Sequence, residues 1–160
     1  MLKKGFFVFF LTALAPFISL AESINITIRG IQPTIGELRI TLIENKVQFK
    51  QYVSKSDADP KPKLGKIIKV TDNIMKLKFE NIPFQNKVWA IAYYHDANCN
   101  GELDKSFFWK IPEEGFGFSR DPSGLPPEFE DTKFEIEGTK NIEMNITYLS
   151  DTPTNPEFCN

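Results

Sequence analysis

The chain has 160 residues, of which 41% are hydrophobic and 25% charged, and its formal net charge is −2 at pH 7. This length predicts one ordinary domain with enough residues for a hydrophobic core. Basic residues are interspersed with acidic ones and form no basic stripe, which argues against a nucleic-acid-binding function. One histidine and two cysteines leave little material for a zinc site.

The N-terminus has the pattern of a secretion signal. Lys3 and Lys4 precede an apolar run over 5–20, and Ser19 and Ala21 place small residues at the −3 and −1 positions of a cleavage site. The run is shorter than the roughly 20 residues that a membrane-spanning helix needs. The alternative interpretation is an uncleaved N-terminal anchor.

Cleavage after Ala21 would remove residues 1–21 as a signal peptide and leave a single domain over 22–160. The sequence therefore predicts an exported protein, periplasmic or extracellular, with no transmembrane segment after cleavage. The removed part holds two lysines and no acid, so the formal charge of the mature chain is 17 − 21, or −4.

Hydrophobic residues alternate with polar ones through the first half of the mature chain. Ile24, Ile26 and Ile28 begin this pattern, which is typical of half-buried strands. It predicts strands over 24–30, 37–42, 66–70 and 74–79. Between the second and third strands the spacing of Phe49 and Tyr52 predicts a short helical turn.

The segment 87–95 differs because nearly every position is apolar or aromatic, which indicates a central strand covered on both faces. Two further strands are predicted over 133–137 and 141–149. The fold class is therefore predicted to be all-β, a seven-stranded immunoglobulin-like or transthyretin-like β-sandwich. Residues 96–131 form one long loop, and loops of this length are usually functional or structured by something else.

The first half of that loop has the arrangement of a calcium-binding loop. Side-chain oxygens at alternate positions converge on one centre when the chain curls, glycine allows the sharp turn, and the next carbonyl turns inward. The candidate ligands are Asp96, Asn98, Asn100, the carbonyl of Glu102, and Asp104, with Gly101 at the turn.

This set is incomplete, because calcium takes six to eight oxygen ligands. Phe107 occupies the twelfth position, where an EF-hand has glutamate, so an EF-hand is not expected. Glu113, Glu114 or Asp121 could supply the missing carboxylate. The alternative is a metal-free turn, since Asn, Asp and Gly also build turns through their own side-chain hydrogen bonds.

Aromatic side chains dominate the second half of the loop. Phe107, Phe108 and Trp109 are consecutive, and they could fold back as a lid over the end of the sandwich or form a candidate binding surface. His95 directly precedes the loop, and a packing role is expected for it because no partner nucleophile is recognisable.

Cys99 and Cys159 both lie in the exported part of the chain. In an oxidising compartment we expect them to form one disulfide. Closing a loop of about 60 residues would stabilise the fold by roughly 4 kcal/mol in the chain-entropy description. The alternative is two free thiols.

A block of short motifs runs from the predicted central strand through the loop: Trp89–Asp96 (WAIAYYHD), Asn98, Asn100-Gly101, Leu103-Asp104, Ile111-Pro112, Glu114–Ser119 (EGFGFS) and Pro126–Phe129 (PPEF). This block resembles a bacterial family of exported proteins, domain of unknown function 2141. The resemblance covers nearly all of the mature chain, and the N-terminal strands contribute only a generic pattern to it.

The resemblance implies a β-sandwich in the periplasm or at the outer surface, and it implies no particular activity. It favours Glu114 over Glu113 as the distant calcium ligand. The chain departs from the family pattern at Cys99 and Trp109, which stand where glycines are usual. Neither is a predicted ligand, and Trp109 enlarges the aromatic segment.

The predicted function is that of a non-enzymatic module, stabilised by one calcium ion, which acts in binding or structure at the cell envelope. Its ligand would be an unidentified protein or glycan. The alternative is a metal-dependent hydrolase or carbohydrate-active protein that uses Asp96, Asp104 and Glu114. No recognisable catalytic constellation supports that alternative.

Overall fold

The computed structural model describes residues 22–54, 64–83, 86–106 and 111–150. The predicted signal peptide (1–21), the aromatic segment Phe107–Trp109 and Cys159 lie outside these residues. Within them no helix is both long enough and apolar enough to cross a membrane.

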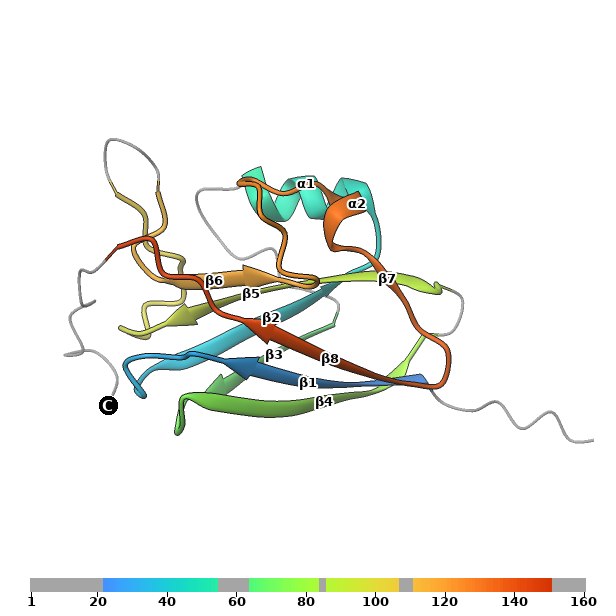
Figure 1. Cartoon of the computed structure of the whole chain (residues 1–160), viewed down its shortest axis with the longest axis horizontal. Coiled ribbons are helices and arrows are strands. Elements are labelled where there is room, and N and C mark those ends of the chain that lie inside the picture. Colours follow the sequence, from blue (N-terminus) through green and yellow to red (C-terminus); the bar gives the residue numbers. More distant parts are fainter. Residues whose placement is uncertain (1–21, 55–63, 84–85, 107–110, 151–160) are drawn as a thin grey trace, which may run out of the picture.

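Two β-sheets face each other, and two helices lie outside one of them (Figure 1). The elements of the described residues, in chain order, are β1 (Glu22–Arg29), β2 (Glu37–Ile43), α1 (Lys46–Ser54), β3 (Leu64–Lys69), β4 (Ile74–Ile82), β5 (Val88–Asp96), β6 (Gly115–Phe118), α2 (Phe129–Thr132), β7 (Phe134–Glu135) and β8 (Thr139–Asn145).

The three-stranded sheet has the order β4-β1-β8. Its central strand β1 pairs antiparallel with β4 and parallel with β8. The isoleucines of β1 face inward and are fully buried, while Asn25, Thr27 and Arg29 alternate with them on the outer face. The alternation in the sequence thus sets which face of this sheet meets the core.

The second sheet has the order β3-β2-β5-β6, with β7 also pairing to β5. β6 and β7 lie along the same side of β5, because β2 pairs antiparallel along the other side. β6 meets the C-terminal half of β5, and β7 meets its first two residues. β5 is therefore the strand around which this sheet is organised.

The main core fills the space between the two sheets. Trp89, Ile91 and Tyr93 of β5 point into it and meet the isoleucines of β1. The opposite face of β5 carries Ala90 and Ala92, which pack beneath the helices in a second cluster built on Phe49 of α1 and Phe129 of α2. The rings of Phe49 and Phe129 lie 5.9 Å apart, in an edge-to-face arrangement. Both faces of β5 are covered, as its uniformly apolar sequence predicts.

The all-β class is confirmed, and the described strands form two sheets. The segment predicted as a single loop over 96–131 contains strand β6, so the described residues form eight strands rather than seven. β6 has no polar-apolar alternation because Gly115 and Gly117 occupy alternate positions. A Cβ atom at Gly117 would lie 2.2 Å from the Tyr93 hydroxyl oxygen, so these glycines let large rings pack onto the backbone.

Candidate metal-binding site

The candidate loop begins where β5 ends. Asp96 is the last residue of β5 and is fully buried. The chain then curls, with positive φ angles at Cys99 (58°) and Gly101 (87°). At the start of the curl, Gly36 lies so close that a Cβ atom there would be 2.4 Å from the carbonyl oxygen of Asp96. The turn before β2 and the start of the loop therefore pack backbone against backbone.

The Asp96 carboxylate organises the curl from inside. Its Oδ1 accepts the backbone N–H of Asn100 at 3.0 Å, and its Oδ2 accepts that of Gly101 at 2.9 Å. Oδ2 also accepts the Arg39 Nε–H at 2.8 Å. The charge of this buried carboxylate is thus balanced by a guanidinium and by two backbone dipoles.

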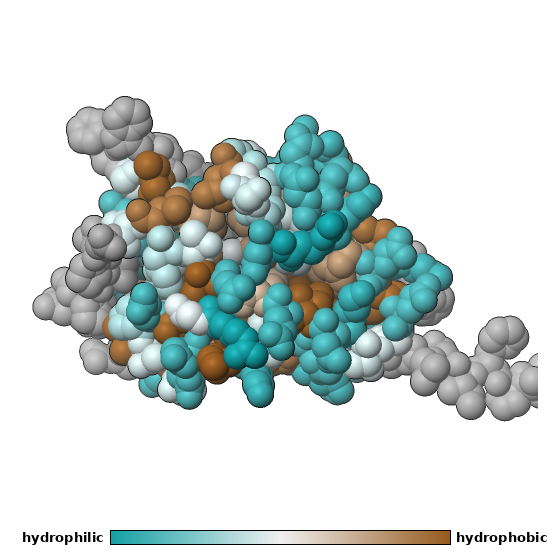
Figure 2. Space-filling model, viewed as in Figure 1, coloured by the Kyte–Doolittle hydropathy of each residue, from teal (hydrophilic) through white to brown (hydrophobic). Residues whose placement is uncertain are grey.

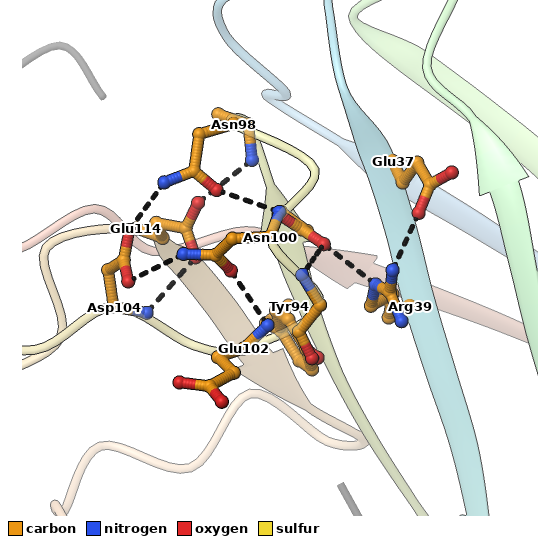
Figure 3. A network of polar contacts seen from close by, with 11 residues as sticks. Glu37, Arg39, Tyr94, Asn98, Asn100, Glu102, Asp104 and Glu114 are labelled. Carbon is orange, nitrogen blue, oxygen red and sulfur yellow. Dashed lines mark hydrogen bonds and ion pairs between the residues drawn. The ribbon is translucent and has the colours of Figure 1, made fainter. Parts of the chain in front are cut away.

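Three side chains at the front of the loop point toward one another (Figure 3). The amide groups of Asn98 and Asn100 donate to the two carboxylate oxygens of Asp104, at 2.7 and 3.0 Å. Their side-chain oxygens accept backbone N–H groups two residues further on, at 3.1 and 2.8 Å. Both asparagines therefore form Asx turns, and their amide groups face the Asp104 carboxylate.

Glu114 closes the site from the entry to β6. Its Oε1 accepts the Ala97 N–H at 2.9 Å, and its Oε2 accepts the Asp104 N–H at 3.2 Å. One carboxylate thereby joins the first and last parts of the curl. Burial raises the pKa of the Glu114 carboxyl to about 7, although these two N–H donors act in the opposite direction.

The predicted ligands do not all belong to this network. Asp96, Asn98, Asn100, Asp104 and Glu114 come together. The side chain of Glu102 is exposed, consistent with a role for its carbonyl alone.

Two alternative ligands lie elsewhere. Glu113 pairs with the carbonyl of Asp104 through its backbone only, at 2.8 Å. Asp121 binds Asn145, whose side chain donates to Oδ2 at 2.8 Å. The carboxylate that enters the network is therefore the one that the family resemblance favours.

Arg39 and Tyr94 belong to the site, although sequence reasoning did not identify them. They are paired residues of β2 and β5 on the outer face of the sheet. Arg39 binds both Asp96 and Glu37, each at 2.8 Å, and the Tyr94 hydroxyl donates to the carbonyl of Gly101 at 2.9 Å. Only the strand register places these side chains at the loop, and one sequence does not give the register.

His95 has a structural role on the inner face of β5. Its Nε2 lies 2.7 Å from the Ile35 carbonyl, which can only accept, so Nε2 carries the proton. Its Nδ1 then accepts the Tyr148 hydroxyl at 2.9 Å. Burial lowers the pKa of this imidazole, which favours the neutral form that both contacts require.

A bacterial family described as an uncharacterized protein conserved in bacteria (DUF2141) matches residues 26–145, which is 120 of the 160 residues. The chain belongs to this family. The matched region runs from β1 to the end of β8 and includes the whole network around Asp96. No curated protein and no solved structure matches this DUF2141 chain.

Three carboxylates and two amides surround the centre of the curl in this DUF2141 domain. In the described residues no three His, Cys, Asp or Glu side chains form a group that could hold a metal ion. An ion here would therefore also need the Asn98 and Asn100 oxygens and the Glu102 carbonyl, which are the neutral ligands that calcium accepts. The residue types fit calcium, provided that the amides now donating to Asp104 turn their oxygens inward.

Proposed function

We propose that this protein is an exported, non-enzymatic β-sandwich module whose 96–114 region binds one calcium ion, and that it acts in binding or structure at the cell envelope. The observation that carries the proposal is the gathering of Asp96, Asn98, Asn100, Asp104 and Glu114 into one network at the end of β5 (Figure 3). Calcium would hold the loop that follows β5 against the sheet. Its charge would attract the Asp104 carboxylate more strongly than the amide donors of Asn98 and Asn100 do.

The net charge of the site supports a cation. When all are ionised, Asp96, Asp104 and Glu114 contribute three negative charges, and Arg39, which pairs with Asp96, is the one cation bonded to them among the described residues. Extracellular calcium modules with few carboxylates bind with dissociation constants of about 10⁻⁴–10⁻³ M, whereas sites with more ligand charge bind more tightly. We therefore expect a dissociation constant on the order of 10⁻⁵–10⁻³ M.

The burial of the carboxylates favours the non-enzymatic module over a hydrolase. Asp96 and Glu114 have exposed fractions of 0% and 2%. Their oxygens are directed to backbone N–H groups and not to solvent. A hydrolytic site needs a carboxylate within reach of a substrate or of its attacking water, and these two offer none.

The position of β1 supports removal of the signal. Ser23, two residues after the predicted cleavage site, donates its N–H to the Gly138 carbonyl at 3.0 Å. Cleavage after Ala21 would leave the strand intact. In an oxidising compartment we further propose the Cys99–Cys159 disulfide. Cys99 is not a free cysteine, and its proposed partner lies outside the described residues.

The two facing sheets support an immunoglobulin-like or transthyretin-like sandwich. In both proposed classes a rigid sandwich displays loops at its ends. The curl that follows Asp96 lies at one end of β5 (Figure 1). This position suits a loop that contacts an envelope protein or glycan.

Calcium binding can be tested with the mature protein, residues 22–160, by isothermal titration calorimetry and thermal unfolding. We expect millimolar calcium to raise the melting temperature, because ligand at 100 times its dissociation constant stabilises a fold by about 2.7 kcal/mol. Absence of both binding heat and stabilisation would exclude the metal.

Asp104→Asn and Glu102→Gln form a matched pair of variants, since each removes one negative charge from the same loop. Asp104→Asn should abolish the calcium effect because it removes a ligand. Glu102→Gln should keep it, because only the carbonyl of Glu102 is proposed to bind. Equal effects from the two variants would indicate general charge attraction and not a defined site.

Export can be tested by expressing the full chain in a bacterium and sequencing the N-terminus of the protein recovered outside the cytoplasm. The expected N-terminus is Glu22. A protein that keeps residues 1–21 and sediments with the membrane would instead support the anchor alternative.

A further inference from the structure

At the other end of β5, a groove opens between the two sheets. It is lined by the start of β5 (Val88), by β7 and its preceding residue, by β8, and by Ser119 and Arg120, and its volume is about 580 Å³. Ligand sites commonly have volumes of about 300–1,000 Å³. Figure 2 shows this face of the molecule, where hydrophobic atoms are visible between hydrophilic residues.

One wall of the groove is the edge of β8 that pairs with no other described strand. The Ile146 N–H, just past this strand, donates to the Arg29 carbonyl at 3.0 Å, so the even-numbered residues of β8 direct their backbone groups to β1. The backbone groups of Asn141 and Glu143 therefore point the other way, into the groove. Asn145 has the same direction, and its N–H is already bonded to Asp121 at 3.2 Å.

The opposite wall is β7, which also has an unpaired side. The Ile136 N–H donates to the Lys87 carbonyl at 3.0 Å, which places the backbone groups of Glu135 on the side away from β5. Between the two walls, Phe134 and Ile142 are half-buried and pack against the main core. The groove thus combines backbone hydrogen-bonding groups at its walls with apolar side chains at its floor.

We propose that this groove binds an extended segment of a partner protein, which adds a strand to the free edge of β8. Strand addition obtains its affinity from main-chain hydrogen bonds and its specificity from alternate side chains. Inward-facing apolar residues of the segment would cover Phe134 and Ile142. The groove lies eight residues along β5 from Asp96 and uses no proposed calcium ligand, so the inference goes beyond the proposed function and stands independently of the ion.

The charges of the groove indicate acidic residues in the partner. Lys133 is paired with Glu130, and Glu143 with Arg29 at 3.4 Å. Arg120 and Lys140 have no carboxylate partner among the described residues, and Glu135 is the one lining acid that is similarly unpaired. A segment with alternating apolar residues and an acid toward each end would complement these two cations.

The probe is a fluorescein-labelled peptide, Glu-Val-Thr-Val-Thr-Val-Glu with blocked ends, titrated with the mature protein by fluorescence anisotropy. We expect saturable binding that persists in EDTA. The same peptide with Lys at both ends should bind several-fold more weakly. Failure of the acidic peptide to bind at millimolar protein, or equal affinity for the two peptides, would overturn the proposed partner chemistry.

Asn141→Pro and Asn141→Ala are the matched variants. Proline is tolerated at an edge strand where the N–H faces away from the sheet, so both variants should fold. Asn141→Pro removes the N–H that faces the groove and should weaken binding about tenfold, whereas Asn141→Ala keeps it and should bind like the wild type. Equal binding by the two variants would contradict strand addition.

Two peptides, N-methylated at the odd or at the even positions, test the same point on the unaltered protein. A strand presents only alternate N–H groups to its neighbour, so one peptide should bind and the other should not. Binding of both would overturn the proposal. Sedimentation equilibrium tests whether the groove instead binds a second copy of this chain. A dimer that Asn141→Pro converts to a monomer would show that it does.

Discussion

The two ends of β5 satisfy their backbone and polar groups in opposite ways. At the Asp96 end, a buried carboxylate, a guanidinium and two asparagine amides bond to one another and to the loop backbone. At the Val88 end, β7 and β8 have backbone groups along a groove that pair with no other described strand. The same strand therefore connects a closed polar network to an open edge.

This difference separates two roles within one fold. Groups that are already bonded to one another stabilise the native state, and removing one leaves its partners buried and unsatisfied. Groups left unpaired at a strand edge contribute little to stability but remain available to a partner. Substitutions at the Asp96 end should therefore change stability, and substitutions at the groove should mainly change binding.

The largest effect is expected for Asp96→Ala. The substitution leaves the Gly101 N–H without its acceptor, and Arg39, which is only 17% exposed, keeps Glu37 as its one carboxylate partner among the described residues. Breaking a buried ion pair costs about 3–5 kcal/mol. Urea unfolding in EDTA measures this loss without any contribution from calcium. Glu102→Ala, which changes an exposed side chain of the same loop, is the control and should stay within about 0.5 kcal/mol of the wild type.

Glu114→Ala should be the next in size. It removes the acceptor of the Ala97 and Asp104 N–H groups, and we expect a loss of about 1–3 kcal/mol by urea unfolding below pH 7, where burial of the Glu114 charge costs least. The adjacent Glu113→Ala should cost much less, because the contact of Glu113 with the Asp104 carbonyl is made by its backbone N–H. Equal costs at the two positions would mean that Glu114 does not hold the curl together.

Gly117→Ala tests the close packing of β6 against the Tyr93 side chain of β5. The added methyl group would meet the Tyr93 hydroxyl, whose hydrogen bond to the Asn145 carbonyl measures 2.9 Å. Overpacking of this kind costs about 1–3 kcal/mol, and the melting temperature should fall accordingly. Gly124→Ala is the matched control, since no atom lies within 4 Å of its added Cβ. A stable Gly117→Ala variant would show that Tyr93 can move freely.

The smallest effect on stability is expected for Lys140→Gln. Lys140 is exposed and has no ion-pair partner among the described residues, so its loss should change unfolding by no more than about 0.5 kcal/mol. The same variant should reduce the preference of the groove for the acidic over the basic peptide. A large loss of stability would show that the Val88 end is as tightly constrained as the Asp96 end.

The sequence predicted the strands whose side chains follow one clear rule. β1 was evident from its three alternating isoleucines, and β5 from a run that is apolar on both faces. The short helix was indicated by Phe49 and Tyr52, and α1 packs on the face of the sheet. β6 was missed because its glycines carry no alternation and serve to admit the rings of Tyr93 and Tyr148.

The candidate site was predictable only where its residues are consecutive. The spacing from Asp96 to Asp104 indicated a curl, and the structure has one, in which the amide groups of Asn98 and Asn100 donate to Asp104. Arg39 lies 57 residues from its partner Asp96, and only the register of β2 against β5 brings the two together. That register depends on packing across the sheet, which the spacing of residues in one strand does not encode.

The parallel pairing of β1 with β8 has a consequence for how the protein reaches its destination. Asn25 contacts Asn141 across 116 positions, so the three-stranded sheet is complete only after its last strand has been synthesised. Such distant pairings form slowly because a long loop must first be closed. In the proposed exported protein this delay would keep the polypeptide unfolded during export. Folding would then be completed after the chain has crossed the membrane.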